Sequence, residues 1–219
     1  MDPKTTTESV ENEWKASVQD AISEFIKIPN QSPMFDKEIL TNGHQDKAIN
    51  LIVKWIESQK VPGLSLKVVR ETGRTPLIYI EVEGEEKSEQ TVLLYGHMDK
   101  QPPMDGQWME GLDARKPVIR GDKLYGRGGA DDGYAVFAAI MAIKAMKQQG
   151  VPHARCVILV EGCEESGSLD LPFYIDALQR EIGRMHVIGI HSGKPSLVVC
   201  LDSGCGNYEQ LWLTNSLRG

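Results

Sequence analysis

The sequence has no long hydrophobic run and no excess of positive charge. No apolar stretch approaches the roughly 18 residues that a membrane-spanning helix needs, so we expect no membrane span. Lysine and arginine number 24 against 31 aspartate and glutamate residues, which gives a formal net charge of −7. No basic cluster stands out, and a nucleic-acid partner is therefore not expected.

Secretory and cysteine-rich features are also scarce. The segment Met1–Trp14 is polar and acidic and contains no apolar stretch of the kind found in signal peptides. The four cysteines show no CxxC spacing and two lie in predicted strands; they are Cys156, Cys163, Cys200 and Cys205. We therefore expect buried free thiols and a cytoplasmic location, rather than disulfides or a cysteine metal site.

Helical and strand patterns alternate along the chain. Helical spacing and composition predict helices over 9–28, 45–58, 132–148 and 171–182. Short apolar runs predict strands over 64–70, 77–82, 91–95, 156–160 and 196–201. The strand 91–95 shows no polar alternation, which is typical of a strand covered on both faces. This order predicts an α/β fold of three layers, with a largely parallel central sheet and helices on both faces.

A glycine-rich loop over 124–133 is the most distinctive stretch of the sequence. Its four glycines within eight residues exclude a regular helix or strand and predict a tight, shaped loop. The loop carries Asp131 and Asp132 to the start of the alanine-rich helix that follows. A loop that delivers two carboxylates in this way predicts a functional site rather than a hinge.

Possible metal ligands follow three of the predicted strands. His97 and Asp99 follow the third strand, Glu164 and Glu165 the fourth, and Asp202 the fifth. Each has an ordinary explanation alone, as a structural histidine, a solvated turn or a helix cap. In α/β sheets, however, sites form beyond the carboxyl ends of the strands, where these residues would meet the glycine loop. Their coincidence predicts a metal cluster, and mixed imidazole and carboxylate ligation suits zinc, with manganese or cobalt possible.

Four segments resemble, in order and spacing, the dinuclear-zinc aminoacylase/carboxypeptidase family of metallopeptidases. Within that family the sequence is most similar to the carnosinase and cytosolic non-specific dipeptidase branch. The segments are Tyr95–Pro102, Asp105–Trp108, Lys123–Asp132 and Glu161–Ser168, and Asp202 follows them. The resemblance covers roughly residues 9–219 and implies a zinc-exopeptidase-like catalytic domain that is incomplete at its C-terminus.

The resemblance implies a ligand set for two zinc ions per complete site. His97 and Asp202 would bind the first metal ion, and Glu165 would bind the second. Asp131 would bridge the two, a role that needs a carboxylate because each oxygen must face a cation.

The resemblance also assigns catalytic roles to two acidic residues. Asp99 would orient His97 and fix its tautomer. Glu164 would act as the general base, taking a proton from the attacking water and passing it to the leaving amine. In this family the peptide bond after the bridging aspartate is often cis, so we expect a cis bond between Asp131 and Asp132.

The implied activity is metal-dependent hydrolysis of dipeptides or short peptides by an activated water. A deacylase or desuccinylase acting on N-acyl amino acids at the same site is one alternative, and a non-catalytic module is another. The Asp-Lys-Gln-Pro-Pro stretch that begins at Asp99 favours the dipeptidase. An intact base at Glu164 argues against a module, since binding alone has no use for it.

The sequence departs from the family pattern at two places. Gly133 and Tyr134 stand where many relatives have Lys-Gly, which bears on substrate preference. The resemblance also makes residues 1–209 the first part of the catalytic domain and residues 210–219 the start of a lid or dimerisation domain. Relatives draw a last histidine ligand and a homodimer contact from the sequence beyond, so we expect these 219 residues alone to be weakly active or inactive. The histidines that match no family ligand are His44, His153, His186 and His191.

Overall fold

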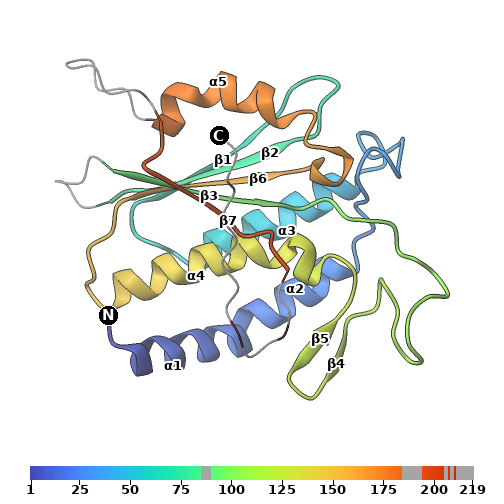
Figure 1. The fold of residues 1–219 in the computed structure, drawn as a ribbon, viewed down its shortest axis with the longest axis horizontal. Coiled ribbons are helices and arrows are strands. Elements are labelled where there is room, and N and C mark those ends of the chain that lie inside the picture. Colours follow the sequence, from blue (N-terminus) through green and yellow to red (C-terminus); the bar gives the residue numbers. More distant parts are fainter. Residues whose placement is uncertain (85–89, 184–193, 205–206, 208–209, 211–219) are drawn as a thin grey trace.

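Figure 1 shows a central sheet with helices on both of its faces. This computed structural model describes residues 1–84, 90–183, 194–204, 207 and 210. Helices α1 to α4 lie on one side of the sheet and α5 lies on the other. The predicted α/β class with helices on both faces is therefore confirmed. None of the described helices is long and apolar enough to cross a membrane.

The helices follow the predicted segments closely, except at the N-terminus. Their bounds are α1 (Pro3–Glu13), α2 (Gln19–Ile26), α3 (His44–Ser58), α4 (Tyr134–Gln148) and α5 (Leu171–Gly183). A π-helical turn over Trp14–Val18 joins α1 to α2. The first helix begins earlier than predicted because Asp2 caps it, its Oδ1 accepting the Thr5 N–H at 2.7 Å, with Pro3 in the first turn.

The five-stranded sheet is mixed rather than largely parallel. Its strands are β1 (Leu64–Val69), β2 (Leu77–Val82), β3 (Thr91–His97), β6 (Arg155–Glu161) and β7 (Leu197–Cys200), in the spatial order β1-β2-β6-β3-β7. Strand β3 runs parallel to β6 and β7, whereas β2 runs antiparallel to both β1 and β6. A short turn joins β1 to β2, and such a connection allows only an antiparallel hairpin. The prediction of a largely parallel sheet is wrong in this half of the sheet.

A second, two-stranded sheet precedes the glycine-rich loop and was not predicted. Strand β4 (Val118–Arg120) pairs antiparallel with β5 (Lys123–Tyr125). Gly121 turns the chain between them with φ of +64°. A Gly-Asp pair between two short runs is a recognised hairpin signal, and it could have revealed this element.

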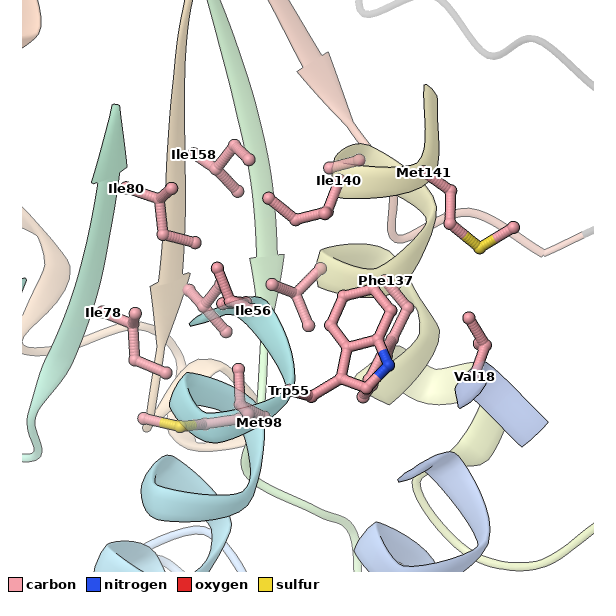
Figure 2. Close-up of a cluster of buried hydrophobic side chains, with 14 of the residues drawn as sticks. Val18, Trp55, Ile56, Ile78, Ile80, Met98, Phe137, Ile140, Met141 and Ile158 are labelled. Carbon is pink, nitrogen blue, oxygen red and sulfur yellow. The ribbon is translucent and has the colours of Figure 1, made fainter. Parts of the chain in front are cut away.

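Two clusters of buried side chains hold the layers together. Figure 2 shows the larger one, in which Ile78, Ile80 and Ile158 of the sheet face Trp55 of α3 and Phe137 of α4. The rings of Trp55 and Phe137 meet edge to face, with centroids 4.6 Å apart. The intervening residues of β2 and β6 point to the opposite face, where they pack against α5. Because β2 and β6 are covered on both faces, residues 77–80 and 156–160 read as continuous apolar runs.

Strand β7 forms an exposed edge of the sheet. Leu197 and Val198 are each about half exposed, and most of β3 beside them is only partly buried. Side chains of β3 nevertheless pack against the buried clusters on both faces of the sheet, so residues 91–95 are covered on both faces, but only in part. The thiols of Cys156 and Cys163 are buried, as expected, whereas Cys200 on β7 is exposed.

Three predictions fall on parts of the chain that the structure does not describe. Cys205 lies outside the described residues, as do His186 and His191. The predicted boundary between residues 209 and 210 also lies there, because residues 208–209 and 211–219 are not described. The two-domain division therefore stays a prediction.

Candidate metal centre

The predicted site residues gather at one edge of the sheet, where β3, β6 and β7 end. His97 is the last residue of β3 and lies opposite Glu161, the last residue of β6. The loop after β6 makes a 3₁₀ turn over Glu164–Ser166, and Asp202 comes two residues after β7. Asp131 lies in the irregular turn Gly129–Gly133 that leads into α4. Three strand ends and one glycine loop thus converge, as the sequence predicted.

The imidazole of His97 lies at the centre of this group. Its Nε2 is 3.2 Å from Asp131 Oδ1, 3.7 Å from Asp202 Oδ2 and 3.8 Å from Glu164 Oε2. The imidazole is fully buried, while the Asp131 side chain is 51% exposed and those of Glu164 and Asp202 are about one-third exposed. The cluster is therefore closed behind His97 and open to solvent on the carboxylate side.

Asp99 links this imidazole to the loop that follows β6. The backbone carbonyl of Asp99 lies 3.0 Å from His97 Nδ1, and the carboxylate Oδ1 lies 3.4 Å from the same atom. The two carboxylate oxygens accept the backbone N–H groups of Glu164 and Glu165, each at 3.1 Å. The Asp99 side chain is fully buried. One residue therefore contacts His97 and also fixes the backbone that carries the predicted base and ligand.

Asp132 is a residue whose place the sequence did not reveal. Its Oδ2 accepts the backbone N–H of His97 at 3.0 Å, while its Oδ1 is buried without a hydrogen-bond partner in the described part of the chain. A Cβ atom at Gly96 would lie 2.6 Å from that Oδ2 and 2.5 Å from the Cβ of Ala135. Only glycine at position 96 lets α4 approach β3 this closely. The peptide bond between Asp131 and Asp132 is cis, as expected.

Gln101 is a second residue to which sequence reasoning gave no role. Its side-chain Nε2 donates a short hydrogen bond to Glu165 Oε2. The other carboxylate oxygen, Oε1, is buried and has no hydrogen-bond partner among the residues described. Spacing along the chain gave no signal for this contact, because it joins loops from two different strands.

The carboxylates and the imidazole shift one another's pKa values. Burial disfavours a charged imidazole, but the carboxylates of Asp131 and Asp99 outweigh burial and raise the pKa of His97 to about 11. His97 in turn holds the pKa of Asp131 below its usual value, and Glu165 acts in the same direction. Burial raises the pKa of Glu165 to about 7 and that of Asp132 to about 8. The acidic groups and the imidazole therefore form one electrostatically coupled cluster.

The donor set fits a divalent metal ion. His97, Asp131 and Asp202 offer ligand atoms that all lie within 4.8 Å of one another, and so do His97, Glu164 and Glu165. Imidazole nitrogen with carboxylate oxygen is a ligand combination that suits zinc and similar ions, and the unpartnered Oε1 of Glu165 is available to one.

These groupings correspond only in part to the predicted ligand sets. The first group is the set expected for the first metal ion. The second contains Glu164, expected as the base, in the place of Asp131. The individual roles stay predictions. His44 and His153 belong to neither group.

Comparison with known proteins identifies the family. Residues 93–209, more than half of the chain, match Peptidase family M20/M25/M40. The chain belongs to this family. The matched region begins in β3 and includes all six predicted site residues, so the whole cluster lies within it.

Several curated relatives of this member of the M20 family belong to the carnosine dipeptidase and DUG1-like branch. The Beta-Ala-His dipeptidase of Mus musculus is 35% identical over 118 residues, which cover 52% of this chain and 22% of that protein. The Cys-Gly metallodipeptidase DUG1 of Saccharomyces cerevisiae is 31% identical over 152 residues, or 66% of this chain and 29% of that protein. The chain thus spans less than a third of either relative.

Solved structures show the same fold. The crystal structure of human carnosine dipeptidase 1 superposes with a TM-score of 0.67 at 22% identity, covering 91% of this chain and 41% of that one. The dipeptidase Dug1p from Saccharomyces cerevisiae superposes with a TM-score of 0.65 at 24% identity, covering 81% and 38%. The mixed sheet with its flanking helices is therefore the M20 catalytic fold.

Proposed function

We propose that this M20 peptidase hydrolyses dipeptides or short peptides with the help of two divalent metal ions, zinc above all. The observation that carries the proposal is the cluster around His97, in which carboxylates from three separate segments surround one buried imidazole. The relatives named above, which are described as dipeptidases, support the choice of substrate.

In this proposal His97, Asp131 and Asp202 bind one metal ion, and Asp131 and Glu165 bind the other. The half-exposed carboxylate of Asp131 lies 3.2 Å from His97 Nε2 and also interacts with Glu165, which suits it to a bridging position. When bound, the metal ions supply Lewis acidity that polarises the peptide carbonyl and lowers the pKa of water.

Glu164 is the proposed general base, which transfers a proton from water to the leaving amine. Its carboxylate is about one-third exposed, so it can reach an attacking water and a peptide at the open side of the cluster. It accepts the proton of the water and delivers it to the nitrogen of the leaving amine, which departs neutral. Because Asp99 holds the N–H of Glu164, the base is supported by a buried anchor and does not depend on the metal ions for its position.

The test compares Glu164→Gln with wild type in the whole protein, using zinc titration and a substrate panel of dipeptides and N-acyl amino acids. The variant should bind zinc with an affinity within about twofold of wild type, because glutamine keeps the size of the side chain. It should lose roughly 10²- to 10⁴-fold in turnover, the usual contribution of a positioned general base. Glu57→Gln on the exposed side of α3 is the matched control and should change neither quantity.

Each contrary outcome has a distinct meaning. Wild-type turnover by Glu164→Gln would show that another group is the base. Preference for N-acyl amino acids over dipeptides would identify a deacylase instead. Failure of the wild-type protein to bind zinc, manganese or cobalt would contradict the proposal as a whole.

A further inference from the structure

Gln101 connects the loop after β3 to the acidic turn after β6. Its Nε2 donates to Oε2 of Glu165, one of the proposed metal ligands, and this hydrogen bond joins side chains from two separate loops. The second oxygen of Glu165, Oε1, is buried and unpartnered in the part of the chain that the structure describes. The two oxygens of this carboxylate therefore have different surroundings.

The backbone of the same turn is held independently of Gln101. Asp99 accepts the N–H groups of Glu164 and Glu165 at 3.1 Å through its two carboxylate oxygens. Asp99 thus fixes the backbone position of Glu165, and Gln101 fixes the position of the Glu165 carboxylate. Removing the amide of Gln101 would release the carboxylate of Glu165 without releasing the turn.

A carboxamide is well suited to hold a metal-binding carboxylate. It donates a hydrogen bond to one oxygen without neutralising the charge that the cation needs. A lysine at this position would compensate that charge itself, and an ionised glutamate would repel it. With Oε2 occupied by Gln101, Oε1 is the oxygen left for a cation.

We propose that Gln101 is a positioning residue that holds Oε2 of Glu165 and so limits Glu165 to binding a metal ion through Oε1 alone. This inference rests on the proposed function, since it assigns Glu165 to a metal ion. It adds a residue that touches neither substrate nor metal and acts only through Glu165.

The experiment titrates the whole protein with Zn²⁺ alone by calorimetry, in wild type, Gln101→Met and Gln107→Met. Methionine keeps the length of glutamine and removes its N–H donors. Gln101→Met should lose about 10- to 100-fold in Zn²⁺ affinity, the usual effect of removing a partner that orients a metal ligand. Gln107 is the matched control: it is exposed and donates only a long contact of 3.9 Å to Met104 Sδ, so its substitution should change nothing.

Two further measurements separate positioning from a general structural defect. The melting temperature of the metal-free protein should be the same in Gln101→Met as in wild type, because Asp99 still holds the turn. The visible spectrum of the Co²⁺-loaded variant should differ from that of wild type, because a freed carboxylate changes the coordination of the ion. If the melting temperature of Gln101→Met falls, the Co²⁺ spectrum still distinguishes the two explanations. A general structural defect weakens metal binding without changing the coordination of the ion.

Failure of the inference differs from failure of the proposed function. If wild type binds Zn²⁺ and Gln101→Met binds it equally tightly, or gives the same Co²⁺ spectrum, Gln101 does not position Glu165. If wild type binds neither Zn²⁺ nor Co²⁺, the metallopeptidase proposal itself is contradicted, and the inference is overturned with it.

Discussion

Several single residues shape the site through contacts with residues that are distant in the sequence. Glycine at position 96 is an example, because it lies under both α4 and the Asp132 carboxylate. Its lack of a side chain is what allows Asp132 to reach the N–H of His97. The geometry of the candidate metal site thus depends on this glycine as well as on the metal-binding side chains.

Gly96→Ala should therefore destabilise the protein by about 1–3 kcal/mol, the usual cost of forcing a methyl group into a packed interior. The methyl group would meet Ala135 Cβ at 2.5 Å and Asp132 Oδ2 at 2.6 Å. Urea unfolding measures the effect. Gly204→Ala is the control, because no atom of the described residues, its chain neighbours aside, lies within 4 Å of a Cβ there. An equal loss in both variants would contradict this account.

Sequence reasoning placed the clustered residues and Asp99 at one site, but it did not reveal the supporting contacts of Asp132 and Gln101. His97, Asp131 and Glu164 could be predicted because each lies at a strand end or in the glycine loop, where the fold class alone predicts a site. Asp132 and Gln101 could not be, because their contacts depend on how closely two loops approach. Sequence spacing carries no information on that distance.

At the scale of elements, the junction between α2 and β3 depends on a buried lysine. The Nζ of Lys100 donates to the backbone carbonyls of Phe25 and Ile28, at 2.6 and 2.7 Å, and lies 4.1 Å from the centre of the Phe25 ring. These carbonyls lie at and just beyond the end of α2, where few helical N–H donors remain. The carbonyl of Phe25 also accepts the backbone N–H of Ile28 at 3.0 Å. Lys100 thus caps one helix from the loop that follows His97.

Lys100→Met should cost about 1–3 kcal/mol, because the carbonyl of Ile28 loses its side-chain donor and that of Phe25 loses one of its two donors. The cost should depend on pH. Burial lowers the pKa of Lys100 to about 7, well below the value of about 10.4 in an unfolded chain. Between these values the unfolded state binds more protons, so the desolvation penalty is fully present below pH 7 and is relieved as the pH rises toward 10.

Urea unfolding of wild type and Lys100→Met, repeated from about pH 6 to about pH 10, checks both expectations. The difference in unfolding free energy should grow with pH above 7. Lys37→Met, at an exposed position, supplies the baseline. The carbonyls of Phe25, Ile26 and Ile28 lie near Lys100 Nζ and favour its charged ammonium form. A difference that shrinks with rising pH would show that these carbonyls outweigh the effect of burial on the pKa of Lys100.

The elements themselves could be predicted more fully than the way they pair. The strand β2 was predicted with its observed bounds, yet its direction in the sheet was not. Burial on both faces gives parallel and antiparallel strands the same apolar sequence, so only the short connection to β1 distinguished them. The hairpin β4–β5 was not predicted because each of its strands has only three residues, too few to show an alternation of polar and apolar side chains.

At the scale of the whole molecule, the cluster around His97 is a place where folding and metal binding are coupled. Four carboxylates surround His97 in the folded chain, and an unfolded chain cannot hold them together. A metal ion that binds only the folded state stabilises it by mass action. The cluster should therefore make the stability of the protein depend on free metal ion.

Zinc at 100 times its dissociation constant should add about 2.7 kcal/mol to the unfolding free energy. For a chain of this size the melting temperature should rise by about 5–10 °C and fall again when a chelator is added. Scanning calorimetry measures the shift. Asp131→Asn removes the proposed bridge and should abolish most of it, whereas a shift that persists in this variant would place the zinc elsewhere.

The hydrogen bonds between Asp99 and two consecutive backbone amides restrict how the sequence of this loop can change. Exchanging side chains at Glu164 or Glu165 leaves both amides where they are, but inserting or deleting one residue in the loop after Glu161 must carry an amide out of reach. Natural or laboratory diversification of this loop should therefore proceed by replacement at constant length. A library of single-residue deletions should show its sharpest intolerance there.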